Sequence, residues 1–479
     1  MSRLALALIV ASIGPITVNS HARADDWLQF RGANAAGLAV GQGKLPAEIG
    51  PEQHVLWKTS LPPGHSSPVI AGSRIYLTAV RDEHLLTIGL DRATGKILWE
   101  AEAPHEVLET VHRIGSHAQS SPATDGKYVV SFFGSSGLYC YDTDGHELWH
   151  HRMGPFKNDF GAGSSPLIVD DHVILGQDHD TDSFLAVYDK ATGRELWKID
   201  RSEFPRNFAT PVIWTVGGRK QIVCAATLRV VGYDFEDGRE LWTVRGIARF
   251  VSATPVVGDD GTLYVAGWAA GGDAGGERFI VPAFDDVVAE YDKNKNGGFE
   301  EAELPEGPIK QRFTQVDRDK SGSLSREEYD FFRRLFSDGK NLVVAIRPGG
   351  TGEITGTHVL WTNQKQVPFC ASPLFTDGRL FTVKDGGILA SLDARTGKQI
   401  KLGRLSSGGA FYSSPVAGDG KVYLVSEPGN LTVISSDGEW QILHTADFGE
   451  NVYATPAIVD GRIYLRTTSA LYCFAADAK

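Results

Sequence analysis

The chain has 479 residues, more than one ordinary hydrophobic core accommodates, so we expect several domains or one repetitive architecture. Its 47 Lys and Arg against 59 Asp and Glu give a formal charge of −12, which disfavours binding to nucleic acids or to anionic lipid surfaces. With 54 glycines, 10 tryptophans and 10% aromatic residues, the composition suits an all-β protein with many turns and excludes a long-helix protein.

Residues 1–24 have the layout of a secretory signal peptide. Arg3 precedes an apolar run over 4–18, and the small-residue triplet 22–24 has the A-x-A form of a cleavage site. The alternative, a buried first helix, is interrupted by Gly14 and Pro15. No cysteine lies near the cleavage point, which argues against a lipid anchor, and no other apolar run reaches the ~18 residues of a membrane span. We therefore expect an exported, soluble protein of the periplasm or cell envelope of a bacterium.

A short phrase recurs along the chain: a small residue, then Ser or Thr, then Pro, followed by a β-rich run. Its prolines are Pro68, Pro122, Pro166, Pro211, Pro255, Pro373, Pro415 and Pro456. Successive prolines are 54, 44, 45, 44, 118, 42 and 41 residues apart, so the step is nearly constant except where 118 residues include an insertion. Such regular spacing is typical of a repeat architecture.

Each unit ends in a turn that carries Asp and Gly, followed by a strand that carries Trp. The segments 91–99, 189–197 and 234–242 share the spelling Asp-x-x-x-Gly-x-x-x-Trp, and 142–149 is one residue shorter. Asp hydrogen-bonds the turn backbone, Gly adopts the left-handed conformation, and Trp covers the neighbouring sheet, so these residues are structural. Four strands in a unit of roughly 40 to 50 residues predict a β-propeller.

This spelling resembles the PQQ-like repeat family, the propellers named after quinoprotein dehydrogenases. The resemblance implies an all-β, eight-bladed propeller with four-stranded blades, divided here into 54–270 and 339–479. The last units depart from the pattern, since Lys401 stands where Trp is expected and the turn before Trp440 is shortened. Residues 25–53 resemble the lead-in segment of exported members, and nothing in their sequence indicates a physical role.

The eighth unit ends after Cys473 without a fourth strand, whereas residues 55–58 precede the first Pro phrase and have the look of one. We predict that 55–58 pairs with the segment near 471–474 and closes the ring. Truncation of either terminus is then expected to be far more damaging than trimming a loop.

Between the second strand of the fifth unit, 263–267, and its third, 342–346, lies an insertion that we place at 271–338. After a Gly-rich linker, apolar residues at helical spacing precede two twelve-residue loops that match the EF-hand pattern: oxygen ligands at positions 1, 3 and 5, a carbonyl at 7 and Glu at 12. The predicted calcium ligands are Asp292, Asn294, Asn296, Gly298 and Glu303 in the first loop, and Asp317, Asp319, Ser321, Ser323 and Glu328 in the second.

Two such loops in tandem, flanked by helical stripes, favour two Ca²⁺ sites over acidic solvated turns. The first positions are 25 residues apart and Pro305 and Pro308 shorten the intervening helix, so a compact pair is expected. Exported sites of this kind bind calcium at ~10⁻⁴ to 10⁻³ M. Whether calcium regulates the protein or only stabilises it stays open.

The resemblance also raises the question of a dehydrogenase site. Quinoprotein alcohol dehydrogenases stack the cofactor PQQ on a disulfide between adjacent cysteines, and no two of the four cysteines here are adjacent. No Cys-x-x-Cys-His haem motif, nucleophile motif or phosphate loop is present. The remaining channel candidates are Gln177, Lys384, Glu427, His117 and Gln119, which we interpret as solvated residues of the rim.

The four cysteines lie at Cys140, Cys224, Cys370 and Cys473, in apolar strand-like runs, and are predicted to be buried free thiols. The favoured function is a non-catalytic, calcium-binding scaffold of the cell envelope that binds a protein or small-molecule ligand on one face of the ring. Its plan is similar to that of the propeller of the bacterial outer-membrane assembly machinery, although the missing lipid-attachment cysteine argues against that role. The alternative is a PQQ-dependent dehydrogenase of alcohols or sugars, for which the sequence gives no supporting site.

Overall fold

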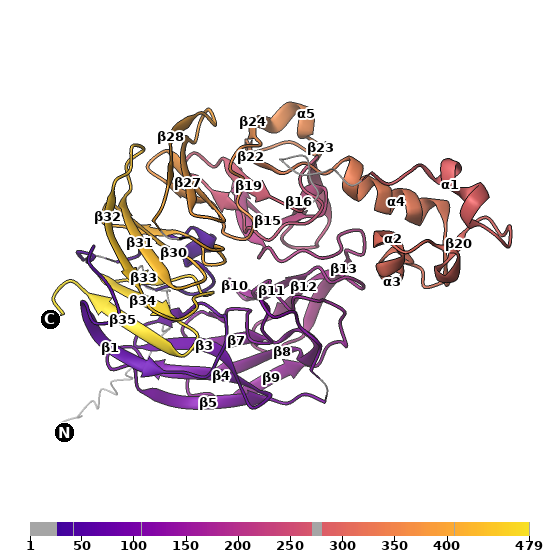
Figure 1. Cartoon of the computed structure of the whole chain (residues 1–479). Helices are drawn as coiled ribbons and strands as arrows, with labels where there is room; N and C mark the ends of the chain where they lie inside the picture. The colour runs from indigo at the N-terminus through magenta and orange to yellow at the C-terminus, as the bar shows by residue number, and fades with distance from the viewer. Residues whose placement is uncertain (1–25, 42, 107, 271–279, 407, 479) are drawn as a thin grey trace, which may run out of the picture.

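The computed structural model describes residues 26–41, 43–106, 108–270, 280–406 and 408–478. The predicted signal peptide lies outside these residues. Eight antiparallel sheets surround a common axis and a helical insert projects from the ring, as Figure 1 shows. The predicted all-β propeller with eight four-stranded blades is confirmed. None of the described helices is long and apolar enough to cross a membrane.

Strands run from the axis outward in chain order within each of the first seven blades. The first four blades are β2 (Val69–Ala71), β3 (Arg74–Arg81), β4 (His84–Asp91) and β5 (Ile97–Ala103); β6 (Ala123–Thr124), β7 (Tyr128–Phe132), β8 (Leu138–Asp142) and β9 (Glu147–His151); β10 (Leu167–Val169), β11 (His172–Gln177), β12 (Phe184–Asp189) and β13 (Glu195–Asp200); and β14 (Val212–Val216), β15 (Arg219–Ala226), β16 (Arg229–Asp234) and β17 (Glu240–Arg245). Short β23 (Gly352–Glu353) pairs with β17 in parallel and α5 (Thr355–His358) follows it.

The fifth blade contains the insertion between its second and third strands, as predicted. The last four blades are β18 (Val256–Val257), β19 (Leu263–Gly267), β22 (Leu342–Ile346) and β24 (Val359–Asn363); β25 (Leu374–Thr376), β26 (Arg379–Lys384), β27 (Ile388–Asp393) and β28 (Gln399–Arg404); β29 (Val416–Gly418), β30 (Lys421–Val425), β31 (Asn430–Ser435) and β32 (Ile442–Asp447); and β33 (Ala457–Val459), β34 (Arg462–Arg466), β35 (Ala470–Ala475) and β1 (Val55–Ser60).

Strand β1 (Val55–Ser60) completes the eighth blade by pairing antiparallel with β35, which confirms the predicted closure. Val55 faces Phe474 and Lys58 faces Tyr472 in this register. The first strand of the ring therefore belongs to its last sheet, which leaves no unpaired outer edge at the junction.

Tryptophans of the repeat join neighbouring blades. The ring of Trp99 packs on the turn glycine Gly145 of the second blade, where an added Cβ would come within 2.6 Å of the indole. Its Nε1 also donates to the carbonyl of Thr143 at 2.9 Å. Trp149 repeats this arrangement on Gly193 of the third blade. The turn needs Gly both for its positive φ and for this close contact. Gly and Trp in the repeat therefore stabilise the same contact between neighbouring blades.

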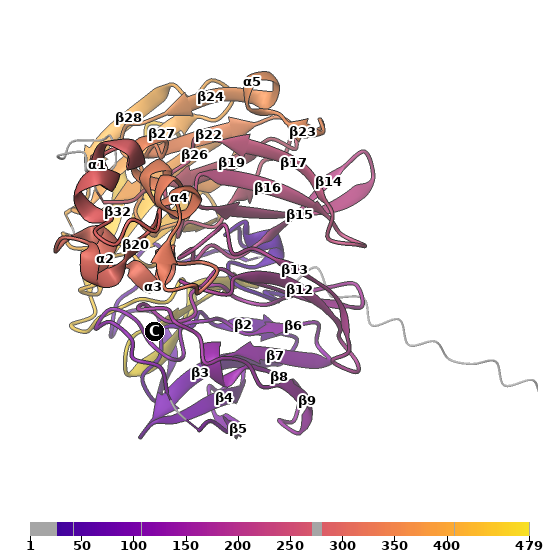
Figure 2. The same cartoon turned by 90° about the vertical axis from the view of Figure 1, so that its right-hand side faces the viewer.

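The insert folds around its own small core. Its elements are α1 (Phe284–Tyr291), β20 (Phe299–Glu300), α2 (Pro308–Gln311), α3 (Phe313–Val316), β21 (Ser323–Leu324) and α4 (Arg326–Ser337). Strands β20 and β21 pair antiparallel, and Phe284, Phe299 and Tyr329 pack together as aromatic pairs. Figure 2 shows these helices gathered at one side of the ring. The helix predicted before the second loop is divided into α2 and α3 at Arg312.

Candidate functional site

The position of a residue in the sequence, counted from its repeat proline, corresponds to its depth along the propeller axis. The residue directly before each proline contributes to a closed ring of hydrogen bonds, because each backbone N–H donates to the hydroxyl of the equivalent residue in the next blade at 2.9 to 3.1 Å. The ring closes when Thr455 donates to Ser67 at 2.9 Å. Its members are Ser67, Ser121, Ser165, Thr210, Thr254, Ser372, Ser414 and Thr455. A Ser or Thr is therefore needed at this position to join the inner strands.

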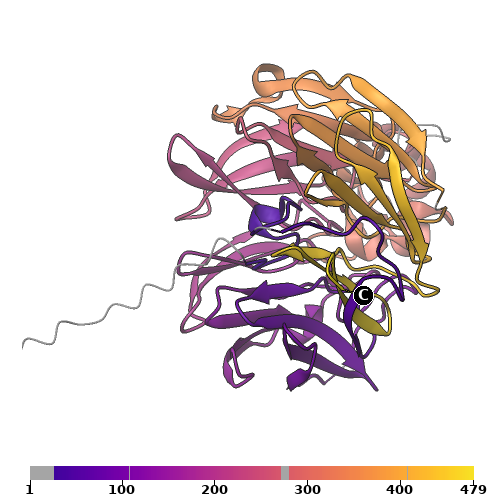
Figure 3. The ribbon, with the colours of Figure 1, turned by 90° about the vertical axis from the view of Figure 1, so that its left-hand side faces the viewer.

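On one side of this hydroxyl ring, the lead-in segment fills the channel. Its backbone pairs with residues two positions after the repeat prolines: Trp27 exchanges two 2.8 Å hydrogen bonds with Ile70, and Ala39 donates to Ala417 at 2.7 Å. The side chain of Asn34 forms a similar pair with Ile213. Figure 3 shows this indigo segment running between the early and the late blades. The segment caps inner-strand edges, which is the physical role that the sequence did not reveal.

Arg31 anchors the lead-in segment, which we call the plug, at the axis. The side chain is fully buried, and its Nη2 donates to the carbonyls of Pro373 at 2.9 Å and Pro415 at 3.2 Å. Burial lowers the pKa of Arg31 to about 9. The neighbouring Phe30 lines the same cavity as the hydroxyl ring, so the plug forms the floor of that cavity.

On the other side of the hydroxyl ring the channel opens into a cavity of about 210 Å³. The residue three positions before each repeat proline lines its wall: His65, Gln119, Gly163, Phe208, Ser252, Cys370, Tyr412 and Tyr453. Further aromatic rings come from Phe160, Phe250 and Phe369. The lining within the described residues contains no Lys, Arg, Asp or Glu. The cavity is thus blind, aromatic and uncharged, and we call its open end the mouth.

Two aromatic side chains at the mouth are held in a defined pair. The imidazole of His65 stacks on Tyr453 with ring centroids 3.8 Å apart. Burial, with the nearby Arg466, lowers the pKa of His65 to about 3, so this ring is neutral near pH 7. The Tyr453 hydroxyl donates to Glu427 at 3.0 Å, and burial raises the pKa of Tyr453.

The predicted channel residues have different surroundings. Gln119 lines the cavity, whereas Gln177 is fully buried and its Nε2 lies 3.2 Å from His179 Nδ1, so its interpretation as a solvated rim residue was wrong. Glu427 is half-buried beside Tyr453, and Lys384 ends strand β26. His117 approaches the carbonyl of Glu109 at 2.6 Å. Comparing the repeat units at the ends of their strands did not reveal the residues that line the cavity. Comparing the residues three positions before each repeat proline would have revealed them.

All four cysteines are free thiols, as predicted. Cys140, Cys224 and Cys473 are buried, and Cys370 is half-buried in the wall of the cavity. Burial raises the pKa of Cys224 to about 11 and that of Cys370 to about 12, so both stay protonated near pH 7.

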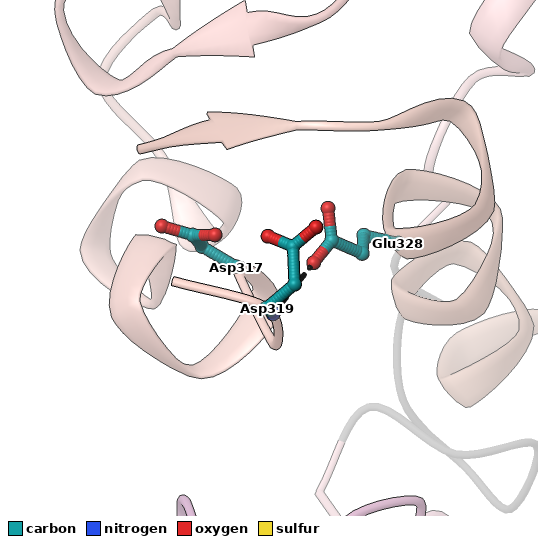
Figure 4. Close-up of side chains that lie close together, drawn as sticks. All are labelled: Asp317, Asp319 and Glu328. Atoms are coloured by element: carbon teal, nitrogen blue, oxygen red, sulfur yellow. Dashed lines mark hydrogen bonds between the residues drawn. The ribbon is translucent and has the colours of Figure 1, made fainter. Parts of the chain in front are cut away.

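The second loop of the insert brings its predicted acidic ligands together. Carboxylate oxygens of Asp317, Asp319 and Glu328 lie within 4.8 Å of one another, and Figure 4 shows the three groups converging. Backbone N–H groups orient them: Ser321 donates to Asp317 at 2.9 Å and to Asp319 at 3.0 Å, and Arg318 donates to Glu328 at 2.7 Å. Ser323, at position 7, accepts from the hydroxyl of Ser321 at 2.9 Å through its carbonyl.

The first loop repeats this hydrogen-bond pattern. Asn296 donates its backbone N–H to Asp292 at 3.0 Å and to Asn294 at 2.9 Å, and the N–H of Lys293 donates to Glu303 at 2.9 Å. Gly298 donates to the side chain of Asn296 at 3.0 Å. Both loops thus hold their oxygens in matching positions.

Glu300 is a residue of the first loop that the sequence analysis missed. It occupies position 9 and accepts from the side-chain amides of Asn294 at 2.8 Å and Asn296 at 2.5 Å. Position 9 contributes to calcium coordination, often through water, so its number within the loop was a usable signal. Each loop therefore presents three carboxylates together with amide, hydroxyl or carbonyl oxygens, a donor set that fits a hard divalent cation.

Known proteins resemble this chain in fold. The crystal structure of BamB from Moraxella catarrhalis covers 88% of this chain and 99% of its own, with a TM-score of 0.54 at 12% identity. The computationally designed Ika8 protein covers 87% and 98%, with a TM-score of 0.52 at 12% identity. A europium-containing methanol dehydrogenase covers 95% and 98%, with a TM-score of 0.44 at 11% identity. The likenesses to BamB and to Ika8 concern the fold alone.

No curated protein matches the chain in sequence. The family model described as outer membrane protein assembly factor BamB matches residues 51–152, 90–269 and 332–477, which is more than half of the chain and omits most of the insert. The chain therefore belongs to this family of PQQ-like β-propellers.

Proposed function

We propose that this protein is a non-catalytic binding scaffold of the bacterial cell envelope, which receives an apolar or aromatic side chain of a protein partner in its axial cavity. The observation that carries this proposal is the blind aromatic cavity itself, which opens at the mouth. Its volume of about 210 Å³ is below the roughly 300 to 1,000 Å³ of typical small-molecule pockets, which favours a side chain over a cofactor.

The cavity lining does not fit PQQ. That cofactor carries three carboxylates, and burying them requires cationic partners or a metal. The described lining contributes hydroxyls, aromatic rings and the neutral His65, with no cationic side chain. The hydroxyl oxygens of the ring already accept backbone hydrogen bonds. We therefore derive no quinone chemistry at this site.

We further propose that the insert binds two calcium ions and is stabilised by them. Three carboxylates within 4.8 Å repel one another unless a cation lies between them, and the N–H groups that hold them leave oxygen lone pairs free. A bound Ca²⁺ would neutralise the cluster around Asp317, Asp319 and Glu328 and the matching set around Asp292 and Glu303. The ion would supply structural stabilisation to the insert.

A photocrosslinking experiment tests the scaffold function. A benzoylphenylalanine at Tyr412, in the cavity wall, should give one discrete adduct with an envelope protein in living cells. The matched control is the same residue at Leu148, an exposed position on the outer strand β9 of the second blade, which should give none.

Equal adducts at both positions, or none at Tyr412, would contradict the scaffold function. Reconstitution of the purified protein with PQQ and Ca²⁺ provides the second readout, because turnover in a dye-reduction assay would favour the dehydrogenase instead.

A further inference from the structure

The insert lies on the same face of the ring as the mouth. Each innermost strand begins at the mouth, because its repeat proline follows the residues that line the cavity. The second strand is antiparallel to it and ends at the mouth, so every connection between second and third strands lies on that face. The insert occupies this connection between β19 and β22.

A second cavity, of about 40 Å³, lies in the seam between the insert and the ring. Pro205, Arg206, Arg249 and Phe250 line it from the ring. The insert contributes Arg312, Gln315 and the apolar side chains of Val316, Phe331, Phe332, Leu335 and Phe336. A cavity of this size holds a few water-sized groups, enough for a carboxylate. Phe250 also lines the axial cavity, so the two cavities share one wall.

The seam has an excess of positive charge. Arg206 forms ion pairs of 2.7 Å with Asp159 and with Asp180. Within the described residues, neither Arg249 nor Arg312 has a carboxylate within 4.0 Å. Among the described residues, three guanidinium groups thus lie near two carboxylates, a local excess of one positive charge in a chain whose formal charge is −12.

The two unpaired guanidinium groups are partly withdrawn from water. Arg249 donates to the carbonyl of Ala270 at 2.9 Å and lies over the rings of Phe250 and Phe336. Burial, with Arg312 and Arg206 nearby, lowers the pKa of Arg249 to about 10. Burial and Arg206 also lower the pKa of Arg312, although Asp180 and Asp159 act to raise it. Both groups stay charged near pH 7, and a bound anion would relieve their repulsion.

We propose that this seam binds a carboxylate of the protein partner, beside the axial cavity that receives its apolar side chain. The proposal deepens the scaffold function and rests on it. Planar guanidinium groups bind carboxylates with paired hydrogen bonds, which adds direction as well as charge. Because Phe250 separates the cavities, the partner segment is expected to place an acidic residue next to an aromatic or aliphatic one.

Two short peptides test the proposal on the full chain with calcium present. Acetyl-Ser-Glu-Phe-Ser-amide should bind at least tenfold more tightly than acetyl-Ser-Gln-Phe-Ser-amide in isothermal titration calorimetry, with an affinity that falls as salt rises. Arg312→Gln should weaken the acidic peptide about tenfold and leave the Gln peptide unchanged. Lys310→Gln removes a charge from the same stretch outside the seam, where Lys310 pairs with Glu306, and should change neither affinity.

Equal binding of the two peptides, or no binding by either, would overturn the carboxylate site. Binding of inorganic phosphate without either peptide would overturn it as well, since the seam would then take a different anion. Crosslinking at Tyr412 separates the two proposals: adducts that persist in Arg312→Gln while the peptides fail to bind leave the scaffold function standing. Absence of adducts in the protein that carries benzoylphenylalanine at Tyr412 and retains Arg312 would contradict the scaffold function itself.

Discussion

Along the propeller axis every ring hydroxyl accepts a hydrogen bond from its neighbour, whereas in the second loop of the insert three carboxylates face one another within 4.8 Å. The ring satisfies its polar groups with its own backbone. The insert leaves a concentration of negative charge that its own side chains do not neutralise. We therefore expect the stability of the ring to depend on its closure, and that of the insert to depend on a bound cation.

Removing the closing strand should have the largest effect. A chain that begins after residue 60 lacks the plug and β1, so it loses the edge pairing of β35 and the hydrogen bonds of Trp27 and Arg31. We expect no cooperative thermal unfolding transition by circular dichroism. A chain in which a short Gly-Ser linker replaces 271–338 is the control and should retain the transition of the ring. A stable truncated chain would show that closure is dispensable.

The second largest effect is expected on calcium binding, which should depend on the insert and not on the ring. Glu328→Gln removes a carboxylate from the converging set, and we expect about a hundredfold weaker binding at one of two sites, roughly 2.7 kcal/mol. Isothermal titration calorimetry would measure it, with the exposed Glu327→Gln as the matched control. Chelation should lower hydrogen-exchange protection in α1 and α4 and leave the blades unchanged. Two unaltered sites in Glu328→Gln would contradict the ligand assignment.

Breaking one hydrogen bond of the hydroxyl ring should cause a smaller, local loss of stability. Thr210→Val keeps the shape of the side chain but leaves the buried N–H of Ser165 without its acceptor. A buried donor without a partner costs about 1–3 kcal/mol, so the free energy of unfolding should fall by that amount in urea titrations. Thr192→Val, on an exposed turn of the third blade, provides a contrast, because its hydroxyl bonds to Asp189 in solvent. Equal losses in both variants would mean that the ring has no special role.

Acid should weaken the ring gradually, in part through the half-buried His65. His65 has a folded pKa of about 3 against an ordinary value of 6.5, so the unfolded chain binds the proton first as pH falls. The stability contributed by neutral His65 is present above pH 6.5 and is lost between there and about pH 3. His65→Phe keeps a ring against Tyr453 and should make the melting temperature less dependent on pH over this range, with His179 accounting for part of what remains. An unchanged pH profile in that variant would exclude His65 as a contributor.

The repeat explains how much of the fold could be predicted. The Pro phrase and the Asp–Gly–Trp spelling specify local turns and strand lengths, and residues within one blade contact neighbours close in sequence. The number of blades, their four strands, the position of the insertion and the pairing of β1 with β35 were all predicted from this spacing. The two loops are equally local, because each spans twelve residues of chain; that their oxygens bind calcium stays a prediction.

The plug and the cavity were not predictable in this way. Trp27 pairs with the first blade, Asn34 with the fourth and Ala39 with the seventh, contacts that no local pattern of the lead-in segment encodes. Likewise, Arg206 and Arg249 come from connections between blades and Arg312 from the insert, so only the closed ring brings them to one seam. Local sequence specified the repeating unit and the two oxygen-rich loops, because the residues of each lie close together in the chain. Tertiary structure decided which end of the channel is closed and which charges meet, because both depend on how eight blades surround one axis.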